Sequence, residues 1–166
     1  FRRADGSNQT NGYADTTAYS PVNSATAMKD VNYWQPITFC NGRTPGYLLP
    51  HWGTVTPFAL ANGAAVRPTQ GPAKMGEPKF MQQALDVIAI SAGLNEYQKT
   101  VAEYWADGPA SETPPGHWML FAQSASAHYR HTLDQDVMLF MAMGNAMHDA
   151  GIETWETTRA YNSVRP

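Results

Sequence analysis

Arg165 is a candidate for binding an oxyanion. Its guanidinium group presents a planar fork of N–H donors that matches the oxygens of a phosphate-like anion. Pro166 follows directly, and a proline at this place ends a helix and fixes the direction in which the arginine points. Arg-Pro pairs occur in many unrelated sequences, so this pair predicts a site only in combination with a longer pattern.

Other side chains have the right types for metal or acid-base chemistry but lack a complete pattern. His128 and His131 are three residues apart, a helical spacing at which two imidazoles can share a metal ion. No recognisable set of His, Asp or Glu completes that site, so we interpret both as histidines favoured by the dipole at a helix end. Three carboxylates are candidates for paired acid and base, although their spacing does not require it: Glu103, Asp107 and Glu112.

The charge balance and the apolar runs exclude several classes of partner. The net charge is −3, from 11 Lys and Arg against 14 Asp and Glu, which gives no electrostatic basis for binding nucleic acid or an anionic membrane. The longest strongly apolar run, residues 137–143, is far shorter than the ~20 residues that cross a bilayer. Cys40 is the single cysteine, so the sequence forms no intrachain disulfide and no thiolate metal cluster.

Residues 1–78 form a first region, rich in loops. Eight of the 12 prolines and eight of the 13 glycines lie there, and repeated X-Pro pairs favour turns and extended segments. Short strands are predicted at residues 37–40 and 54–56. Because a solvated linker would not carry so many aromatic rings, we expect residues 10–60 to wrap over helices or a neighbouring subunit and to bury Trp34 and Trp52.

Residues 79–166 form a second region with helical patterning. The first helix ends at Gly93, and Asn95 is suited to cap the second. The prolines after Thr113 are typical of a first helical turn, so a third helix begins there. Thr132 with Gln135 has the spacing of a capping box and predicts the start of a fourth.

The fourth predicted helix spans residues 133–161 and is apolar on most of its faces. A helix of this kind is typical of the centre of a bundle, so we expect the other three helices to bury it. The predicted fold class is therefore all-α: a helical bundle of about four helices in the second half, with a long loop-rich N-terminal wrap.

Longer strings resemble one known family. Residues 99–109 (KTVAEYWADGP) and 113–118 (TPPGHW) are similar to a helix-loop-helix signature of vanadium-dependent haloperoxidase-like proteins, which share a superfamily with the type 2 acid phosphatases. The upstream segments 30–37 and 51–58 resemble the loop-rich part that precedes this signature. Residues 145–166 are similar to the family's first oxyanion-binding helix, so the resemblance covers nearly the whole chain.

The resemblance implies roles for three residues. The family's first motif is a lysine, six residues and then Arg-Pro, so Arg165 is implied to bind the oxyanion and vanadate is the implied cofactor. The lysine position falls on Thr158, whose neutral side chain departs from the pattern. Arg159 is the neighbouring residue that could substitute for the missing charge, although adjacent helical residues point about 100° apart. The family's later motifs lie outside this chain, so no complete catalytic set is expected within it.

The resemblance also implies partners and a set of alternative functions. A further polypeptide is expected to complete the bundle, in a protein that forms an oligomer and is extracellular or periplasmic. The leading hypothesis is a portion of a protein that oxidises halide with peroxide and is inactive as this chain alone. The alternatives are a phosphatase-type hydrolase of the same superfamily and a degenerate, non-catalytic structural subunit.

Overall fold

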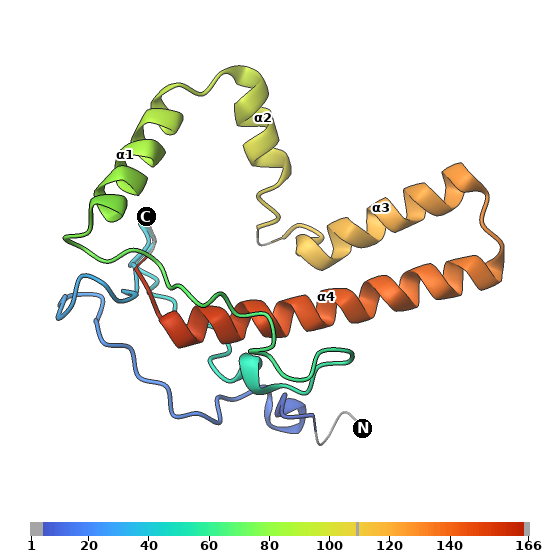
Figure 1. Ribbon diagram of the computed structural model, residues 1–166, viewed down its shortest axis with the longest axis horizontal. Coiled ribbons are helices and arrows are strands. Elements are labelled where there is room, and N and C mark those ends of the chain that lie inside the picture. Colours follow the sequence, from blue (N-terminus) through green and yellow to red (C-terminus); the bar gives the residue numbers. More distant parts are fainter. Residues whose placement is uncertain (1–4, 109, 165–166) are drawn as a thin grey trace. The chain divides into compact units, whose positions relative to one another are not determined.

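The computed structural model describes residues 5–108 and 110–164, and the regular secondary structure within them is helical (Figure 1), which confirms the predicted fold class. Four α-helices follow the loop-rich first region: α1 (Pro78–Ala92), α2 (Glu96–Tyr104), α3 (Thr113–Tyr129) and α4 (Leu133–Tyr161). Two short 3₁₀ turns, η1 (Gln9–Asn11) and η2 (Trp52–Thr54), interrupt the loops. The strands predicted at residues 37–40 and 54–56 are wrong, because the described residues contain only one isolated β-bridge, between Tyr33 and Ser163.

The helix boundaries follow from local capping. Asn95 accepts a hydrogen bond from the Gln98 backbone N–H, and the Gln98 side chain accepts one from the Asn95 N–H, which is the reciprocal capping box at the start of α2. Thr132 and Gln135 make the same exchange at the start of α4, with distances of 2.8 and 3.4 Å. Both predicted caps are therefore confirmed.

The chain divides into two compact units, and α4 contributes to both. One unit combines the chain up to Val87 with the chain from Asp149 onward, and the other is Ile88–His148. The division at residues 78 and 79, which rests on composition, stays a prediction as a domain boundary.

In the first unit, loops pack closely on the second half of α4. Ile152 and Val55 are almost fully buried there. A Cβ added to Gly53 would lie 2.5 Å from the Cα of Glu156, so the loop backbone touches the helix backbone at this point. Trp34 and Trp52 are half-buried, so the expectation of ordered, covered indoles is met in part.

Side chains bonded to backbone groups hold these loops in shape. Asn23, which is 1% exposed, donates to the carbonyls of Asp30 and Tyr33 and accepts from the N–H groups of Lys29 and Asp30. The buried carboxylate of Asp149 accepts hydrogen bonds from three consecutive loop N–H groups, at residues 58–60. Loops without secondary structure satisfy their backbone polar groups in this way.

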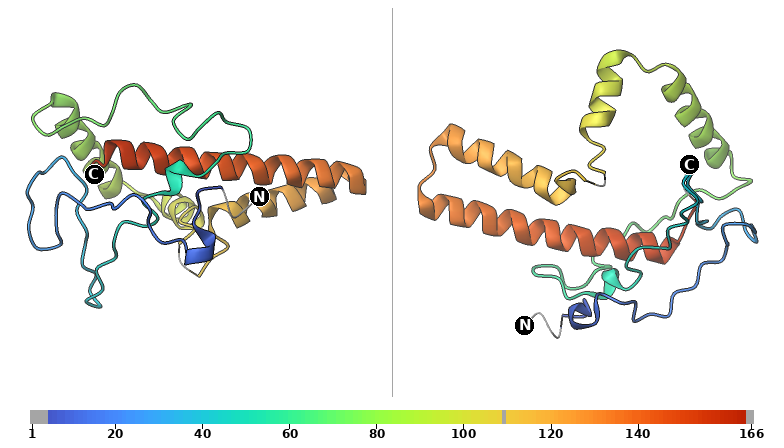
Figure 2. Two further views of the ribbon diagram at one scale, coloured as in Figure 1. Left: turned by 90° about the horizontal axis from the view of Figure 1, so that it is seen from below. Right: turned by 180° about the vertical axis from the view of Figure 1, so that it is seen from behind.

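In the second unit, α3 lies beside the first half of α4 (Figures 1 and 2), and Met119 comes within 3.6 Å of the position that a Cβ on Gly144 would take. The bounds of the fourth helix match the prediction, but its burial does not. Only Asp149 and Ile152 of α4 are buried, whereas Val137, Met138 and Met141 are more than half exposed. The prediction that three helices bury α4 is therefore wrong for this chain. Apolar periodicity identifies the face of a helix that can be buried, but it does not show which element covers that face.

No described helix combines the length and apolar character needed to span a bilayer.

Candidate functional site

The last turn of α4 carries two of the three predicted site residues. Thr158 is exposed and Arg159 is half-buried. Arg165, the predicted oxyanion-binding residue, lies outside the described residues. The site described below is therefore the end of α4 and the loops that approach it within the first unit.

A cavity of about 520 Å³ lies on one side of Thr158. Its walls are largely aromatic and aliphatic, from the first-region loops, and its polar side chains come from Gln35, from the end of α4 and from the residues just after it. The lining includes Trp34, Ile37, Phe39, Tyr47, Leu48, Trp155, Thr158, Asn162 and Ser163. The indole N–H of Trp155 donates to the carbonyl of Leu48 at 2.9 Å and so ties this loop to the helix.

Thr158 also lines a second cavity, of about 590 Å³. Helix α1 forms one wall through Phe80, Ala84 and Val87, and Asp86 adds a carboxylate. Thr158 and Ser163 line both cavities, so the position that the family resemblance assigned to lysine lies on the wall that the two cavities share.

Arg159 is directed to an aromatic ring. Its guanidinium carbon lies 4.4 Å from the centre of the Tyr19 ring, in a cation–π contact. Burial raises the pKa of Tyr19 above its usual value, although the hydrogen bond with Asn162 and the charge of Arg159 act in the opposite direction. The Nε of Arg159 is buried and has no hydrogen-bond partner among the described residues. Its predicted role as a substitute for lysine stays a prediction.

Asn162 fixes the chain that leads from α4 toward residue 165. Its backbone has φ of 44°, in the left-handed region that asparagine tolerates better than most residues. Its side-chain oxygen accepts from the Tyr19 hydroxyl at 3.0 Å, and its carbonyl accepts from the N–H of Trp34 at 2.9 Å. The Val164 N–H then donates to the carbonyl of Asn32. Segments 32–34 and 162–164 are thus held side by side.

The polar groups of the two cavities are hydroxyls and amides in largely apolar walls, with the carboxylate of Asp86 in the second cavity. Among residues 5–108 and 110–164, no lysine or arginine lines either cavity. An oxyanion with several negative charges needs positive charge as well as neutral donors. Neither cavity, as the described residues line it, therefore supplies the positive charge that an oxyanion site needs, and the predicted role of Arg165 stays a prediction.

Sequence reasoning named Thr158, which lines both cavities, from the family resemblance alone, and it did not find Tyr19, Tyr47 or Asn162. The Tyr19 hydroxyl and the Asn162 amide are 143 residues apart in the chain, and no local pattern connects residues so distant. The available signal was the number of aromatic residues in the Pro-rich loops, which indicated a covered surface without indicating which surface.

Comparison with protein-family models gives no match for this chain. Comparison with curated proteins gives none either. Among solved structures, the fold is similar to one described as the first bacterial vanadium-dependent iodoperoxidase, with a TM-score of 0.73 and 25% sequence identity. The similarity covers 98% of this chain and 39% of that protein. Over nearly its whole length, the chain therefore has a haloperoxidase-like fold.

Proposed function

We propose that this chain is a portion of a vanadium-dependent haloperoxidase-like protein that oxidises halide with peroxide. The observation that carries the proposal is the fold similarity to an iodoperoxidase over 98% of the chain. The position of Thr158 supports it, because the residue aligned with the family's lysine lies where two cavities meet. When bound, vanadate would supply the activation of peroxide toward halide.

The proposal requires residues beyond those described. Thr158 and Ser163 offer neutral hydroxyl groups, and Arg165 is the residue of this chain proposed to supply positive charge. The solved structure is much longer, since the similarity spans 39% of it. The described residues that line the two cavities include no lysine or arginine, so they do not complete an anion site by themselves.

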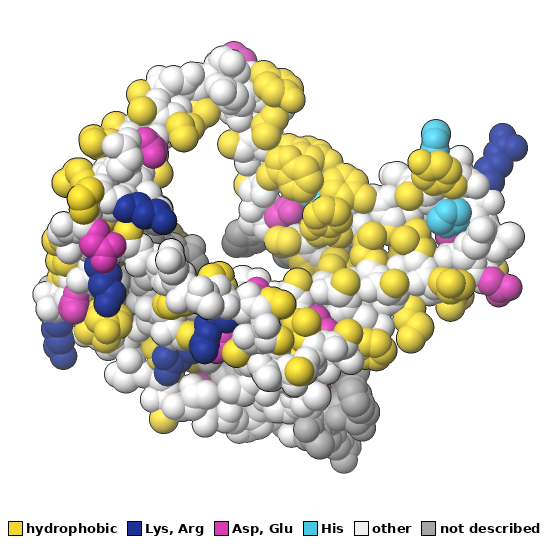
Figure 3. Space-filling model, viewed as in Figure 1, with side chains coloured by type: hydrophobic (Ala, Val, Ile, Leu, Met, Phe, Trp, Pro, Cys, Tyr) yellow, Lys and Arg dark blue, Asp and Glu magenta, His cyan; other side chains and the backbone are white. Residues whose placement is uncertain are grey.

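The exposed apolar surface supports a further polypeptide that completes the bundle. Met81, Leu85 and Ile88 of α1 and Met138 and Met141 of α4 are each more than half exposed. Hydrophobic side chains also lie openly along α3 and α4 in Figure 3. Monomeric proteins rarely leave such extended apolar surface open to water. Assembly into an oligomer and a location outside the cytoplasm are part of the same proposal.

A second candidate function is a non-catalytic structural subunit, and Thr158 favours it. A threonine cannot supply the charge of a lysine at this position, and Arg159 is directed to Tyr19. A phosphatase-type hydrolase would use an oxyanion pocket of the same kind. Activity assays on the full-length protein distinguish the three functions.

The test adds vanadate, peroxide and either iodide or bromide to the full-length protein, and in a separate assay a phosphate ester. Halogenation that depends on peroxide and vanadate supports the first function, and ester hydrolysis supports the phosphatase. Absence of both activities supports the structural subunit.

Two lysine variants refine the test. We expect Thr158→Lys to raise halide oxidation about tenfold or more, because a preorganised charge at an oxyanion is commonly worth 10²–10³ in rate. Thr154→Lys is the matched control, since Thr154 lines only the first of the two cavities, one helical turn earlier. An equal effect of the two substitutions would contradict the assigned role of position 158.

A further inference from the structure

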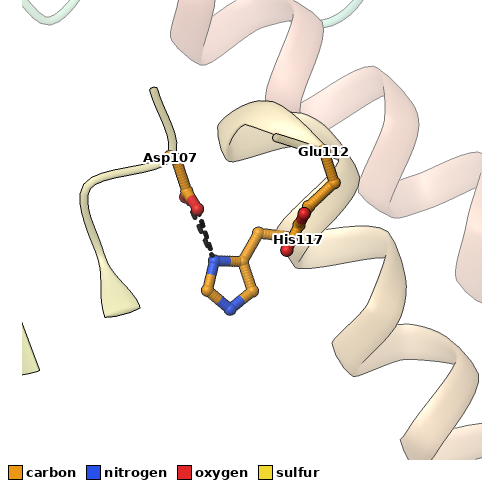
Figure 4. A group of neighbouring side chains, drawn as sticks. All are labelled: Asp107, Glu112 and His117. Atoms are coloured by element: carbon orange, nitrogen blue, oxygen red, sulfur yellow. Dashed lines mark hydrogen bonds and ion pairs between the residues drawn. The ribbon is translucent and has the colours of Figure 1, made fainter. Parts of the chain in front are cut away.

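Three potential metal ligands meet at the junction between α2 and α3, within the second compact unit (Figure 4). Asp107 follows α2, Glu112 is the residue before α3, and His117 lies in the second turn of α3. One ligand atom from each side chain lies within 4.8 Å of the other two.

His117 and Asp107 form a hydrogen-bonded pair that is almost fully shielded from solvent. Their side chains are 5% and 9% exposed, and Nδ1 of His117 lies 2.9 and 3.1 Å from the two carboxylate oxygens of Asp107. The imidazole stacks on Trp105 with ring centres 5.0 Å apart, and Phe121 lies 4.8 Å away on a tilted ring. These rings fix the orientation of the imidazole and limit the access of water to it.

Glu112 is the third potential ligand of the group. It occupies the N-cap position of α3 but its side chain makes no capping hydrogen bond, so the helix does not use its carboxylate. A Cβ added to Gly116 would lie 2.9 Å from the Cβ of Glu112. The absence of a side chain at Gly116 therefore leaves the space in which the Glu112 side chain crosses the first turn of α3 beside His117.

We propose that Asp107, Glu112 and His117 bind a divalent metal ion of the zinc class. One imidazole nitrogen with carboxylate oxygens is a donor set that suits Zn²⁺, whereas Mg²⁺ and Ca²⁺ prefer oxygen donors throughout. Ligand atoms at ~2.0–2.2 Å from a shared tetrahedral metal stand about 3.4 Å apart, so a metal would replace the proton between Asp107 and His117 and widen their hydrogen-bonded separation of 2.9 Å slightly. Rotation of the exposed Glu112 side chain brings in the third ligand. Three protein ligands leave a coordination position open for water or an anion.

The test is titration of the full-length, metal-stripped protein with ZnCl₂, followed by isothermal calorimetry. We expect one equivalent to bind and Glu112→Gln to weaken that binding at least tenfold, with an unchanged melting temperature of the metal-free protein. Glu103→Gln is the matched control, because Glu103 is an exposed glutamate on α2 outside the cluster. Gly116→Ala is expected to weaken Zn²⁺ binding as well, because it displaces the Glu112 side chain.

The Glu112 variant keeps the proposal testable even if substitution of His117 prevents folding. If the pair of Asp107 and His117 is only structural, Glu112→Gln leaves Zn²⁺ affinity equal to that of Glu103→Gln, and the proposal is overturned. Absence of one-equivalent Zn²⁺ binding to the wild-type protein, or equal affinity for Mg²⁺, also overturns it. The proposal does not depend on the proposed haloperoxidase function, since the cluster and the assay are separate from the site on α4.

Discussion

At the scale of single residues, the side chain of Asp149 holds a loop segment against α4 by hydrogen bonds. Its buried carboxylate accepts hydrogen bonds from Phe58, Ala59 and Leu60 at 2.5, 2.7 and 3.0 Å. We expect Asp149→Asn to lower the free energy of unfolding by about 2–4 kcal/mol, because hydrogen bonds to a charged group are strong and the amide NH₂ would face N–H donors. Urea denaturation measures the loss. The exposed Asp134→Asn is the control, with an expected change under about 1 kcal/mol.

Tyr19 offers a second test at this scale, with a dependence on pH. Tyr19→Phe removes the hydroxyl that donates to Asn162 but keeps the ring under Arg159, so we expect a loss of about 1 kcal/mol of unfolding free energy. Burial raises the pKa of Tyr19, so its hydroxyl favours the neutral form in the folded protein. Its contribution to stability is therefore complete below the ordinary tyrosine pKa of 10.0 and is lost as pH rises through the raised pKa of the folded state. The measurement is the difference in unfolding free energy between wild type and Tyr19→Phe as a function of pH. A difference that stays constant as the pH rises through this alkaline range would contradict the assignment.

At the scale of elements, α4 depends on glycines that let loops approach its backbone. Gly53→Ala would place a Cβ 2.5 Å from the Cα of Glu156, which is backbone and cannot rotate away. We expect this substitution to lower the unfolding free energy by about 2–4 kcal/mol through overpacking. Gly46→Ala is the control, because no atom lies within 4 Å of its added Cβ. Thermal melting of the two variants gives the comparison, and equal melting temperatures would refute the close packing.

At the scale of the whole molecule, the open apolar surface determines how the chain behaves in solution. We expect the 166-residue chain, prepared by itself, to bind the dye ANS and to self-associate at micromolar concentration, because Met138 and Met141 are 71% and 59% exposed. The double substitution of both methionines by glutamate is expected to reduce association in sedimentation velocity. A monomer that binds no dye would show that the surface needs no partner.

The sequence predicted helices well because their determinants are local. The capping exchanges at Asn95 and Thr132 lie within three residues, and apolar periodicity located the body of each helix. The loops could not be placed in the same way. Asp149 meets its N–H partners about 90 residues away, and no period in the chain encodes that contact.

From the sequence, Thr158 of the candidate site could be named, whereas the residues that tertiary packing brings to it could not. Thr158 came from a resemblance in sequence, and the structure places it at two cavities. The partners that surround it, Tyr19 and Asn162 among them, meet through tertiary packing and carry no separate local signal. The burial of α4 was overestimated for a related physical reason. An apolar face shows that a helix can be buried, but not whether another element of the chain covers it.

The hydrogen bonds between the early loops and the end of α4 also determine an order of events in folding. Leu48 is bonded to Trp155, and Tyr19 to Asn162, across 107 and 143 residues of intervening chain. During synthesis at ~5–20 residues per second, these loop residues are made roughly 5–30 s before their partners on the end of α4. Contacts of high sequence separation form slowly, whereas the helices of Ile88–His148 find their partners nearby. The middle of the chain is therefore expected to acquire amide protection first in pulse-labelled hydrogen exchange, and the N-terminal segment, although made first, to fold last.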